Sequence, residues 1–477
     1  MSACGKICAA GLFAMMISVQ LWSQDSNPAQ TDNGQQGAEQ QQGAVPAQSD
    51  LTQGIAAHPE DRMQTPPPVG VQSYPVTFSS EERSNYLRYG AVFTTAHTDN
   101  AVFGISKTPV SDVSYSIAPT ISIDETTSRL HWLATYAPGF TFYQRISQYN
   151  EADQNAVLQI TFRLSPHVTF SAEDRFQKSS NVFNQPNLGS DLAVSGGTGV
   201  PNLSVIAPTA SRLSNVGSVG FTYQYALNQM VGASGMFTNL DYPNPSQVPG
   251  LYNSSSQAGS GFYSLRISKM HYIGVTYQYQ RLMAYPTGGQ SETETHAALF
   301  FYTLNNPLAH FSVSVFGGPQ YSDSVVPPTP PAQPSLLEVK SWDPAAGASF
   351  SWQGRLTSLA VSYSRVIAAG GGLVSAVHTD DASGIIRRQL MKKLSGALNA
   401  EYAQNRLIAG SFGGSENGHT VSGTASLQQG FGQHLNVAIG YTRLHQSYGQ
   451  IAVIAAEPDT NREFISISYQ FSRPLGR

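Results

Sequence analysis

Apolar side chains alternate with small or polar ones along most of the chain, from Tyr86 almost to the C-terminus. In the segment 113–123, Val, Tyr, Ile and Pro side chains at odd positions interleave with Ser, Ala and Thr at even positions. The same period of two recurs at 311–315, 359–364 and 465–471. A period of two places each set of side chains on one face of a β-sheet. The pattern therefore predicts an all-β protein with one apolar and one polar sheet face.

Segments of about ten residues with this alternation divide the chain into expected strands. There are about 18 of them, within a range of roughly 16 to 20, because strand bounds derived from one sequence shift by several residues. The expected strands are 86–97, 113–123, 129–143, 155–164, 168–177, 215–226, 230–239, 260–268, 272–281, 294–304, 309–319, 342–352, 356–366, 382–390, 394–404, 418–428, 434–444 and 462–471.

The connections between these strands are short and long in turn. A soluble β-sandwich also has one apolar face, so alternation alone leaves that architecture open. Tight turns that alternate regularly with connections of roughly 11 to 37 residues are the signature of an outer-membrane barrel. We therefore expect a transmembrane antiparallel up-and-down β-barrel over 81–477. The short connections are DETTS at 124–128, SPH at 165–167, ALNQ at 226–229, KMH at 269–271, NNPL at 305–308, QGR at 353–355, MKK at 391–393 and GFGQ at 430–433.

The first 80 residues differ from the rest of the chain. Residues 1–23 contain Lys6 and an apolar run over 7–19, which is shorter than the roughly 20 residues needed to span a bilayer. A cleaved secretory signal is the favoured interpretation, with a short anchoring helix as the alternative. Residues 24–80 are rich in Gln, Pro and Ala, so they are expected to form a disordered periplasmic leader, either a spacer or a contact to the cell wall.

Composition narrows the function further. Only 12% of residues are charged and the net charge is −4, which makes nucleic acid an unexpected partner. Tyr (23), Phe (22) and Gly (43) are abundant while mean hydropathy is −0.20, a combination that favours strands over helices. Both cysteines, Cys4 and Cys8, lie in the expected signal, so the mature chain has no disulfide and no cysteine-based metal site.

Aromatic side chains gather near the expected strand ends. Trp132 follows a tight turn, Trp352 precedes one, and Trp342 follows a long connection. Rings in these places are typical of the two interface girdles of a membrane barrel. The alternative is that they cap the core of a soluble protein.

Three segments resemble known outer-membrane proteins. The segment REFISISYQF at 462–471 resembles the last strand of bacterial outer-membrane proteins, whose final aromatic is read by the barrel-assembly machinery. The resemblance implies that Phe471 is an assembly signal, although SRPLGR follows it here. The segments RLHWLATYAPGFTF (129–142) and FRLSPHVTFSAEDRFQKSSNVFNQ (162–185) resemble porin-like barrels of acidobacteria, over roughly 86–471. This likeness implies a barrel in the cell outer membrane and carries no catalytic motif.

The expected barrel is wide enough to hold water. Strands about 4.8 Å apart and tilted about 40° give 18 strands a backbone diameter of roughly 35 Å. Barrels of this size leave an aqueous channel, and the side chains expected inside are mainly Ser, Thr, Gly, Ala and Gln. The sequence therefore predicts passive diffusion of small hydrophilic solutes, with no cofactor and no catalytic or metal site.

Charged residues are expected on the lumen wall. Arg163, Glu173 and Arg175 have inward positions, and Arg266 is expected across the barrel from them. They are candidates for setting ion selectivity, or they form wall salt bridges without a selective role. Asp174 interrupts the outward apolar face, which predicts a bulge or a register shift there.

The longest connection, 178–214, is the third of the long ones. It resembles the third loop of general porins, which folds into the lumen as a constriction, and Asp191 is its only acidic residue. A surface loop over the barrel mouth is the alternative.

An enzyme is not expected. His97, His378, His419 and His445 lie near strand ends, but no catalytic motif surrounds them. The segment 378–381, His-Thr-Asp-Asp, is either a loop site for a cation or a solvated turn. The run PPTPPAQP at 327–334 is either a stiff outer loop or a ligand for a partner groove.

Two other functions stay open at this point. One is a surface structural or adhesion barrel with a closed lumen, and the other is an exopolysaccharide export barrel. The expected partners are outer-membrane lipids, the barrel-assembly machinery and the solutes, and a homotrimer and a monomer are both compatible with the sequence.

Overall fold

The computed structural model describes the part of the chain that carries the alternating pattern. The described residues are 63, 85–102, 108–180, 183, 210–245, 250–286, 289–327, 337–408, 417–448 and 459–475. The expected signal 1–23, the leader 24–80 apart from Met63, and Asp191 lie outside these ranges.

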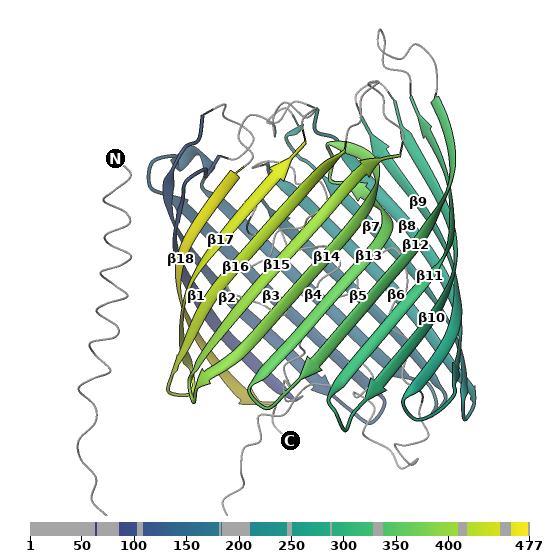
Figure 1. Ribbon diagram of the computed structural model, residues 1–477. Helices are drawn as coiled ribbons and strands as arrows, with labels where there is room; N and C mark the ends of the chain where they lie inside the picture. The colour runs from purple at the N-terminus through teal and green to yellow at the C-terminus, as the bar shows by residue number, and fades with distance from the viewer. Residues whose placement is uncertain are drawn as a thin grey trace, which may run out of the picture. The chain divides into compact units, whose positions relative to one another are not determined.

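The described residues form eighteen β-strands, the expected number (Figure 1). One 3₁₀ turn, η2 (Ser147–Tyr149), precedes β4, and no described helix is long and apolar enough to cross a membrane. The strands are β1 (Tyr86–Thr98), β2 (Asp112–Thr126), β3 (Leu130–Tyr143), β4 (Glu151–Arg163), β5 (Val168–Ser179), β6 (Arg212–Ala226), β7 (Gln229–Asp241), β8 (Asn253–Arg266), β9 (His271–Tyr285), β10 (Ser291–Asn306), β11 (Phe311–Val326), β12 (Leu337–Gln353), β13 (Thr357–Gly370), β14 (Val374–Met391), β15 (Leu394–Leu407), β16 (Gly418–Phe431), β17 (Leu435–Ser447) and β18 (Asp459–Pro474).

Each strand pairs antiparallel with its neighbours in sequence, and the last strand pairs with the first. The β1–β18 ladder runs from Tyr86 opposite Pro474 to Thr98 opposite Arg462. The sheet is therefore a closed antiparallel up-and-down barrel, which confirms the expected fold. Closure removes the free strand edges that an open sheet would expose.

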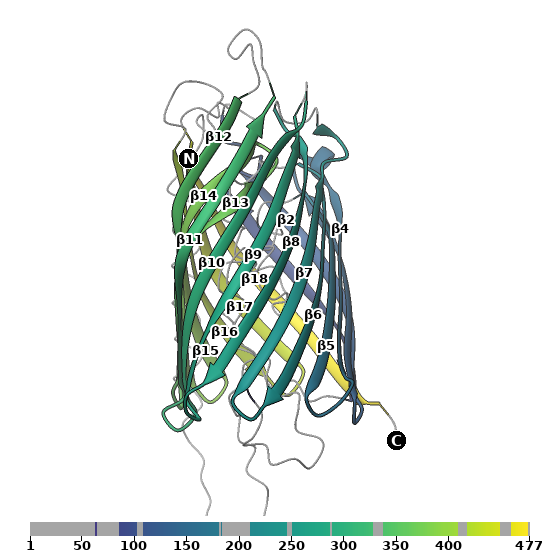
Figure 2. The same cartoon turned by 90° about the vertical axis from the view of Figure 1, so that its right-hand side faces the viewer.

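The two ends of the barrel differ in their connections (Figures 1 and 2). At one end, which we call the turn end, all eight connections are tight, as in 392–393 between β14 and β15. At the other end, the loop end, most connections are longer. The loop-end connections are shorter than expected, most of all 286–290 after β9 and 371–373 after β13. There the strands extend into segments that the sequence suggested were loops, and Gly371 and Gly372 form the second turn with φ of 67° and 86°.

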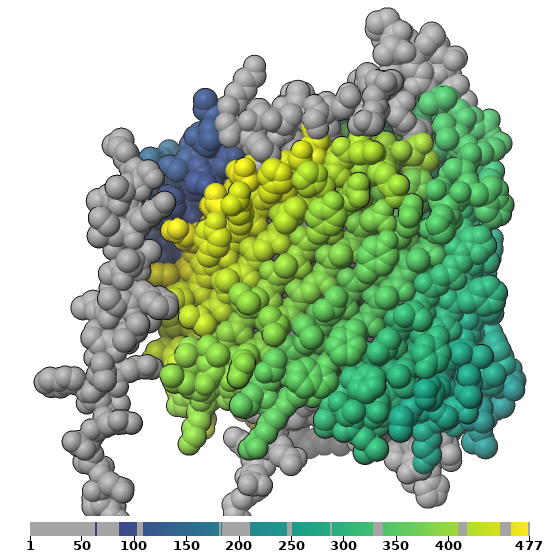
Figure 3. All heavy atoms as spheres, viewed as in Figure 1, coloured from purple at the N-terminus to yellow at the C-terminus, as the bar shows by residue number. Residues whose placement is uncertain are grey.

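The alternation places apolar side chains on the outer face of the sheet. Phe93, Ile117, Tyr277, Val361 and Ile467 are each between 43% and 54% exposed, although they are large and apolar. Figure 3 shows part of this surface, where the side chains of β13–β18 cover the barrel wall. A continuous apolar outer surface is stable only if it faces lipid.

Some phenylalanines that point inward lie against glycines on the neighbouring strand. The pairs are directly opposite in register: Gly232 and Phe262, Gly274 and Phe301, Gly347 and Phe316, and Gly440 and Phe464. A Cβ at any of these glycines would come within 2.2 to 2.4 Å of the ring. The absence of a glycine side chain therefore lets each ring pack along the wall, which limits how far it reaches into the lumen.

Candidate functional site

The candidate site is the lumen, which has two zones. Inward side chains in the turn-end halves of β2 and β6, among them Thr120, Ser122 and Thr222, are partly exposed. In the loop-end half, Thr293, Asn405 and Gln446 also point inward but are at most 1% exposed. The turn-end wall is therefore partly open at β2 and β6, whereas burial covers the loop-end half. Burial also reaches the turn end at β8, β10 and β11, where Ser264, Thr303 and Ser314 are at most 8% exposed.

A hairpin that bends into the barrel fills part of the loop-end half. It consists of 366–378, the adjoining ends of β13 and β14 with their turn, and we call it the inner hairpin. The Tyr242 hydroxyl donates a hydrogen bond to the Gly371 carbonyl at 2.6 Å, and the Tyr252 N–H donates one to the Gly372 carbonyl at 2.9 Å. Both tyrosines belong to the connection between β7 and β8, several strands away around the wall. The inner hairpin therefore crosses the lumen.

Apolar contacts fix the inner hairpin at its tip and along its length. At the tip, Leu373 packs against a buried cluster of Ala210, Leu240, Tyr242 and Leu251. Along its length, Ile367, Ala369 and Ala376 pack with Leu282 and Ile408.

Tyr242, which contacts the tip of the inner hairpin, keeps its hydroxyl proton. Burial raises the pKa of the Tyr242 hydroxyl above its ordinary value, so the group keeps its proton and donates to Gly371. This contact joins the inner hairpin to the opposite wall at neutral pH.

The sequence did not indicate this constriction. The sequence instead suggested the connection 178–214, with Asp191, as the constriction, and most of this connection lies outside the described residues. The one available signal for the inner hairpin was the run of three glycines at 370–372 between apolar residues, which suits a tight turn.

Glu173 and Arg175 lie side by side on the inner face of β5. The Arg175 guanidinium forms an ion pair with Glu173, and Gln159 of β4 also donates to Glu173 at 3.2 Å. Arg163 is the last residue of β4 and is 8% exposed, so it lies in the wall at the turn end. The structure thus brings two of the four expected wall residues into direct contact.

Arg266 does not lie across the barrel from the others. It ends β8, three strands from β5, and donates to the Leu227 carbonyl at 2.7 Å and to Asn228 Oδ1 at 3.0 Å. The expectation was wrong because alternation assigns a face of the sheet but not a position around the barrel. Arg266 stabilises the β6–β7 turn.

Sequence reasoning missed other charged residues on the inner wall. Asp124 of β2 lies 3.8 Å from Arg88 of β1 and 3.1 Å from His131 of β3, near the turn end. Asp381 and Glu401 face inward on β14 and β15 in the loop-end half. Each is an isolated charge at an inward position of a strand, so alternation was the one signal that could have found it.

Asp174 lies on the outer face without any bulge. The ladders of β5 with β4 and with β6 are continuous around it. Its carboxylate accepts a hydrogen bond from Asn215 Nδ2 at 3.2 Å, on the same face of β6. The expected register shift is therefore wrong, because a polar neighbour on the outer face takes the place of a backbone irregularity.

The segment 378–381 belongs to β14, so it is neither a loop site nor a turn. Asp380 faces outward and pairs with Arg406 at 2.8 Å and Arg365 at 3.7 Å, whereas Asp381 faces inward. Among the described residues there is no group of three or more His, Cys, Asp or Glu side chains that could hold a metal.

Aromatic rows lie near both ends of the outer surface. At the loop end, Tyr279, His296, Tyr321 and Trp342 are opposite one another on β9–β12, with ring centroids 5.1 to 6.4 Å apart. On the same strands, the next row of outer-face residues towards the loop end is charged. It consists of Arg281, Glu294, Asp323 and Lys340.

The turn end carries its own rings. Trp132 Nε1 donates to Glu125 at 3.2 Å, and Trp352 lies opposite Phe311. Phe471 lies outward on β18, with its ring centroid 5.1 Å from that of Tyr89 on β1.

These features define a class of protein. The sheet is closed, its outer face is apolar between two aromatic rows, and charges follow beyond the loop-end row. Closed antiparallel barrels of this kind satisfy their backbone in lipid and are the outer-membrane form of membrane protein. The chain is a transmembrane β-barrel of the outer membrane.

Comparison with known proteins adds likeness of fold at low identity. No family model and no curated protein matches the chain. OccK2 (OpdF) of Pseudomonas aeruginosa is similar with a TM-score of 0.42 and 10% identity, over 82% of this chain and 98% of that one. OccAB4 of Acinetobacter baumannii has a TM-score of 0.40 and 8% identity, over 82% and 99%. The ferric citrate transporter FecA has a TM-score of 0.40 and 10% identity over 78% of this chain, which spans only 61% of FecA.

Proposed function

We propose that the barrel lets small hydrophilic solutes diffuse passively across the outer membrane. The observation that carries this proposal is the partly exposed, polar inner wall of β2 and β6 in the turn-end half, with small residues such as Thr120, Ser122 and Thr222. An 18-stranded barrel is too wide for such side chains to fill. The inner hairpin would then be the narrowest point of the path, and no catalytic step is proposed.

Reconstitution tests the proposal. Purified protein in planar bilayers is expected to give stable ohmic conductance steps, and liposomes containing it are expected to swell in small sugars faster than in large ones. Correctly folded protein that inserts without conductance or swelling would contradict the proposal. That outcome would favour a structural or adhesion barrel with a closed lumen, for which the buried loop-end half of the wall is the supporting observation.

We also propose that the wall charges tune ion selectivity. Glu173→Gln removes the negative charge beside Arg175 and makes the inner wall of β5 more positive. The reversal potential in a KCl gradient is expected to shift by several millivolts towards that of chloride. Asp174→Asn changes the same charge one residue away on the outer face and is expected to leave the reversal potential unchanged. Equal shifts in both variants would show that the wall charge is not selective.

The outer rings have their own proposed roles. We propose that Trp342 lies at one lipid headgroup region and that Trp132 and Trp352 lie at the other, because amphipathic rings are favoured there. Phe471 is proposed as the aromatic read by the barrel-assembly machinery. Its outward position beside Tyr89, where the last strand meets the first, supports this role.

A further inference from the structure

The wall between β12 and β13 has the shortest ladder among the described strand pairs. β12 pairs with β11 along its length from Leu337 to Trp352, but it pairs with β13 only from Ala346 to Gln353. Residues 337–345 of β12 and residues 366–370 of β13 therefore form no β-ladder with each other. We call this stretch the lateral seam. Since no ladder hydrogen bonds cross it, side-chain contacts hold it closed.

The ladder stops because the inner hairpin turns away from the wall. Ile367 has the same alternation parity as the outward residues Val361 and Tyr363. It is nevertheless 1% exposed and packs against Leu282, which points inward from β9. The face of the inner hairpin that would meet lipid in a regular barrel is therefore turned against the inner wall.

One polar contact links the two sides of the lateral seam. His378 Nε2 of the inner hairpin lies 3.4 Å from Asp343 Oδ2 of β12. Asp343 also accepts a hydrogen bond from the Ser341 hydroxyl at 2.8 Å on its own strand. Separation of the inner hairpin from β12 would break this side-chain pair but no row of ladder hydrogen bonds between the described residues.

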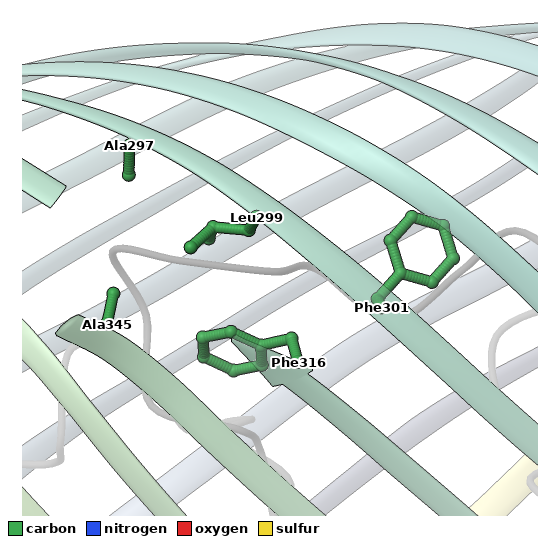
Figure 4. Packing of buried hydrophobic residues seen from close by; sticks show 5 residues of the cluster. All are labelled: Ala297, Leu299, Phe301, Phe316 and Ala345. Atoms are coloured by element: carbon green, nitrogen blue, oxygen red, sulfur yellow. The ribbon is translucent and has the colours of Figure 1, made fainter. Parts of the chain in front are cut away.

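The interior beside the lateral seam is apolar. Figure 4 shows five buried side chains together on β10, β11 and β12, and one of them is the residue next to the last β12–β13 pair. The five are Ala297, Leu299, Phe301, Phe316 and Ala345. This patch lies in a wall that elsewhere presents mainly Ser and Thr. Apolar wall surface gains nothing from a sugar or an ion but is stabilised by contact with an alkyl group.

The height of the lateral seam fits this chemistry. Its lower end at Ala346 is four residues from Trp342 towards the turn end. With a rise of about 3.3 Å per residue and a tilt of about 40°, this places the lower end roughly 10 Å below the ring row. If the Trp342 row marks the headgroups, the part of the lateral seam on its turn-end side, residues 343–345 of β12, lies beside the acyl chains of the outer leaflet.

We propose that the lateral seam is a side passage for amphipathic molecules with an alkyl chain, between the lumen and the outer leaflet. The patch around Leu299 and Phe316 is buried in this structure; in the open passage the alkyl chain lies on it, and the polar end stays in the lumen. Local movement of the inner hairpin around His378, away from Asp343, opens the passage, while the tip keeps its contacts with Tyr242 and Tyr252. This adds a second class of solute and does not depend on the diffusion of hydrophilic ones.

A reversible crosslink tests the proposal. Asp343→Cys with His378→Cys, in a chain whose Cys4 and Cys8 are alanine, allows a cleavable thiol reagent to lock the inner hairpin to β12. The matched control is Ser362→Cys with Ser383→Cys, whose native hydroxyls are 2.7 Å apart within the β13–β14 ladder. The control crosslink leaves the lateral seam free. Heat-modifiable migration in gels verifies that each variant has folded.

The readouts are uptake of radiolabelled laurate by cells of a bacterial host without its own fatty-acid channel, and sugar-driven liposome swelling. Crosslinking the 343/378 pair is expected to lower laurate uptake several-fold, with recovery after reduction, while the control pair has no effect. The proposal would be overturned if the crosslink left laurate uptake unchanged, or if uptake never exceeded the level of cells without the barrel. Swelling reports separately on the hydrophilic path, so its loss alone would count against the proposed function and not against the side passage.

Discussion

Gly372→Val is expected to raise the single-channel conductance several-fold. A Cβ at this position would come within 2.4 Å of the Tyr242 ring and 2.8 Å of the Tyr252 carbonyl oxygen. The backbone of Gly372 has φ of 86°, which a β-branched residue rarely adopts. The substitution therefore forces the tip of the inner hairpin away from the opposite wall. Planar-bilayer recordings of the purified variant measure the result.

Gly432→Val is the matched control for this prediction. Gly432 also has a positive φ, 71°, in the tight turn between β16 and β17, but a Cβ there would meet nothing within 4 Å. Similar backbone strain without a clash is expected to leave conductance unchanged. If both variants conduct like the native protein, the inner hairpin does not limit the path.

Ile121→Arg is expected to prevent stable assembly of the barrel. Ile121 lies mid-strand on the outer face of β2, is 46% exposed and stands between Tyr89 and Tyr136. An arginine near the bilayer midplane costs about 2–4 kcal/mol in a membrane barrel. The fraction of protein that shows heat-modifiable migration after refolding into lipid vesicles measures the effect.

Thr120→Arg, one position earlier, is expected to assemble normally. Thr120 faces the lumen opposite Gly90, where an arginine can extend into water. The contrast between neighbouring positions separates a lipid-facing sheet from a soluble one, because a soluble barrel would tolerate the charge on its outer face. Equal yields for the two variants would contradict the membrane assignment.

The architecture was predictable because its signal is local. In β2 each Ile, Tyr or Val at an odd position is followed by a small or polar residue, and the expected strand 113–123 lies within Asp112–Thr126. Strand ends were less clear, since Ser and Thr occur on both faces there. Glu173 and Arg175 fall on one face by the same rule, and their ion pair follows from positions two residues apart.

Features that depend on distant partners were not predictable. Residues 366–378 are mainly a run of apolar and glycine residues without alternation, and contacts with Leu282 and Tyr242, far away in sequence, decide that the hairpin bends inward. In the same way, Asn215 on the next strand accommodates Asp174 on the outer face. Tertiary packing decides both features, and the two-residue alternation carries no information about tertiary packing.

The pairing of Tyr86 with Pro474 has a consequence for biogenesis. Until β18 meets β1, the growing sheet has two unsatisfied borders that no earlier strand can cover, and each is a template for misassociation. The cylinder is therefore closed by two strands that lie far apart in the sequence, Tyr86–Thr98 and Asp459–Pro474. Both borders stay open until this pair forms, whatever the order in which the other strand pairs form.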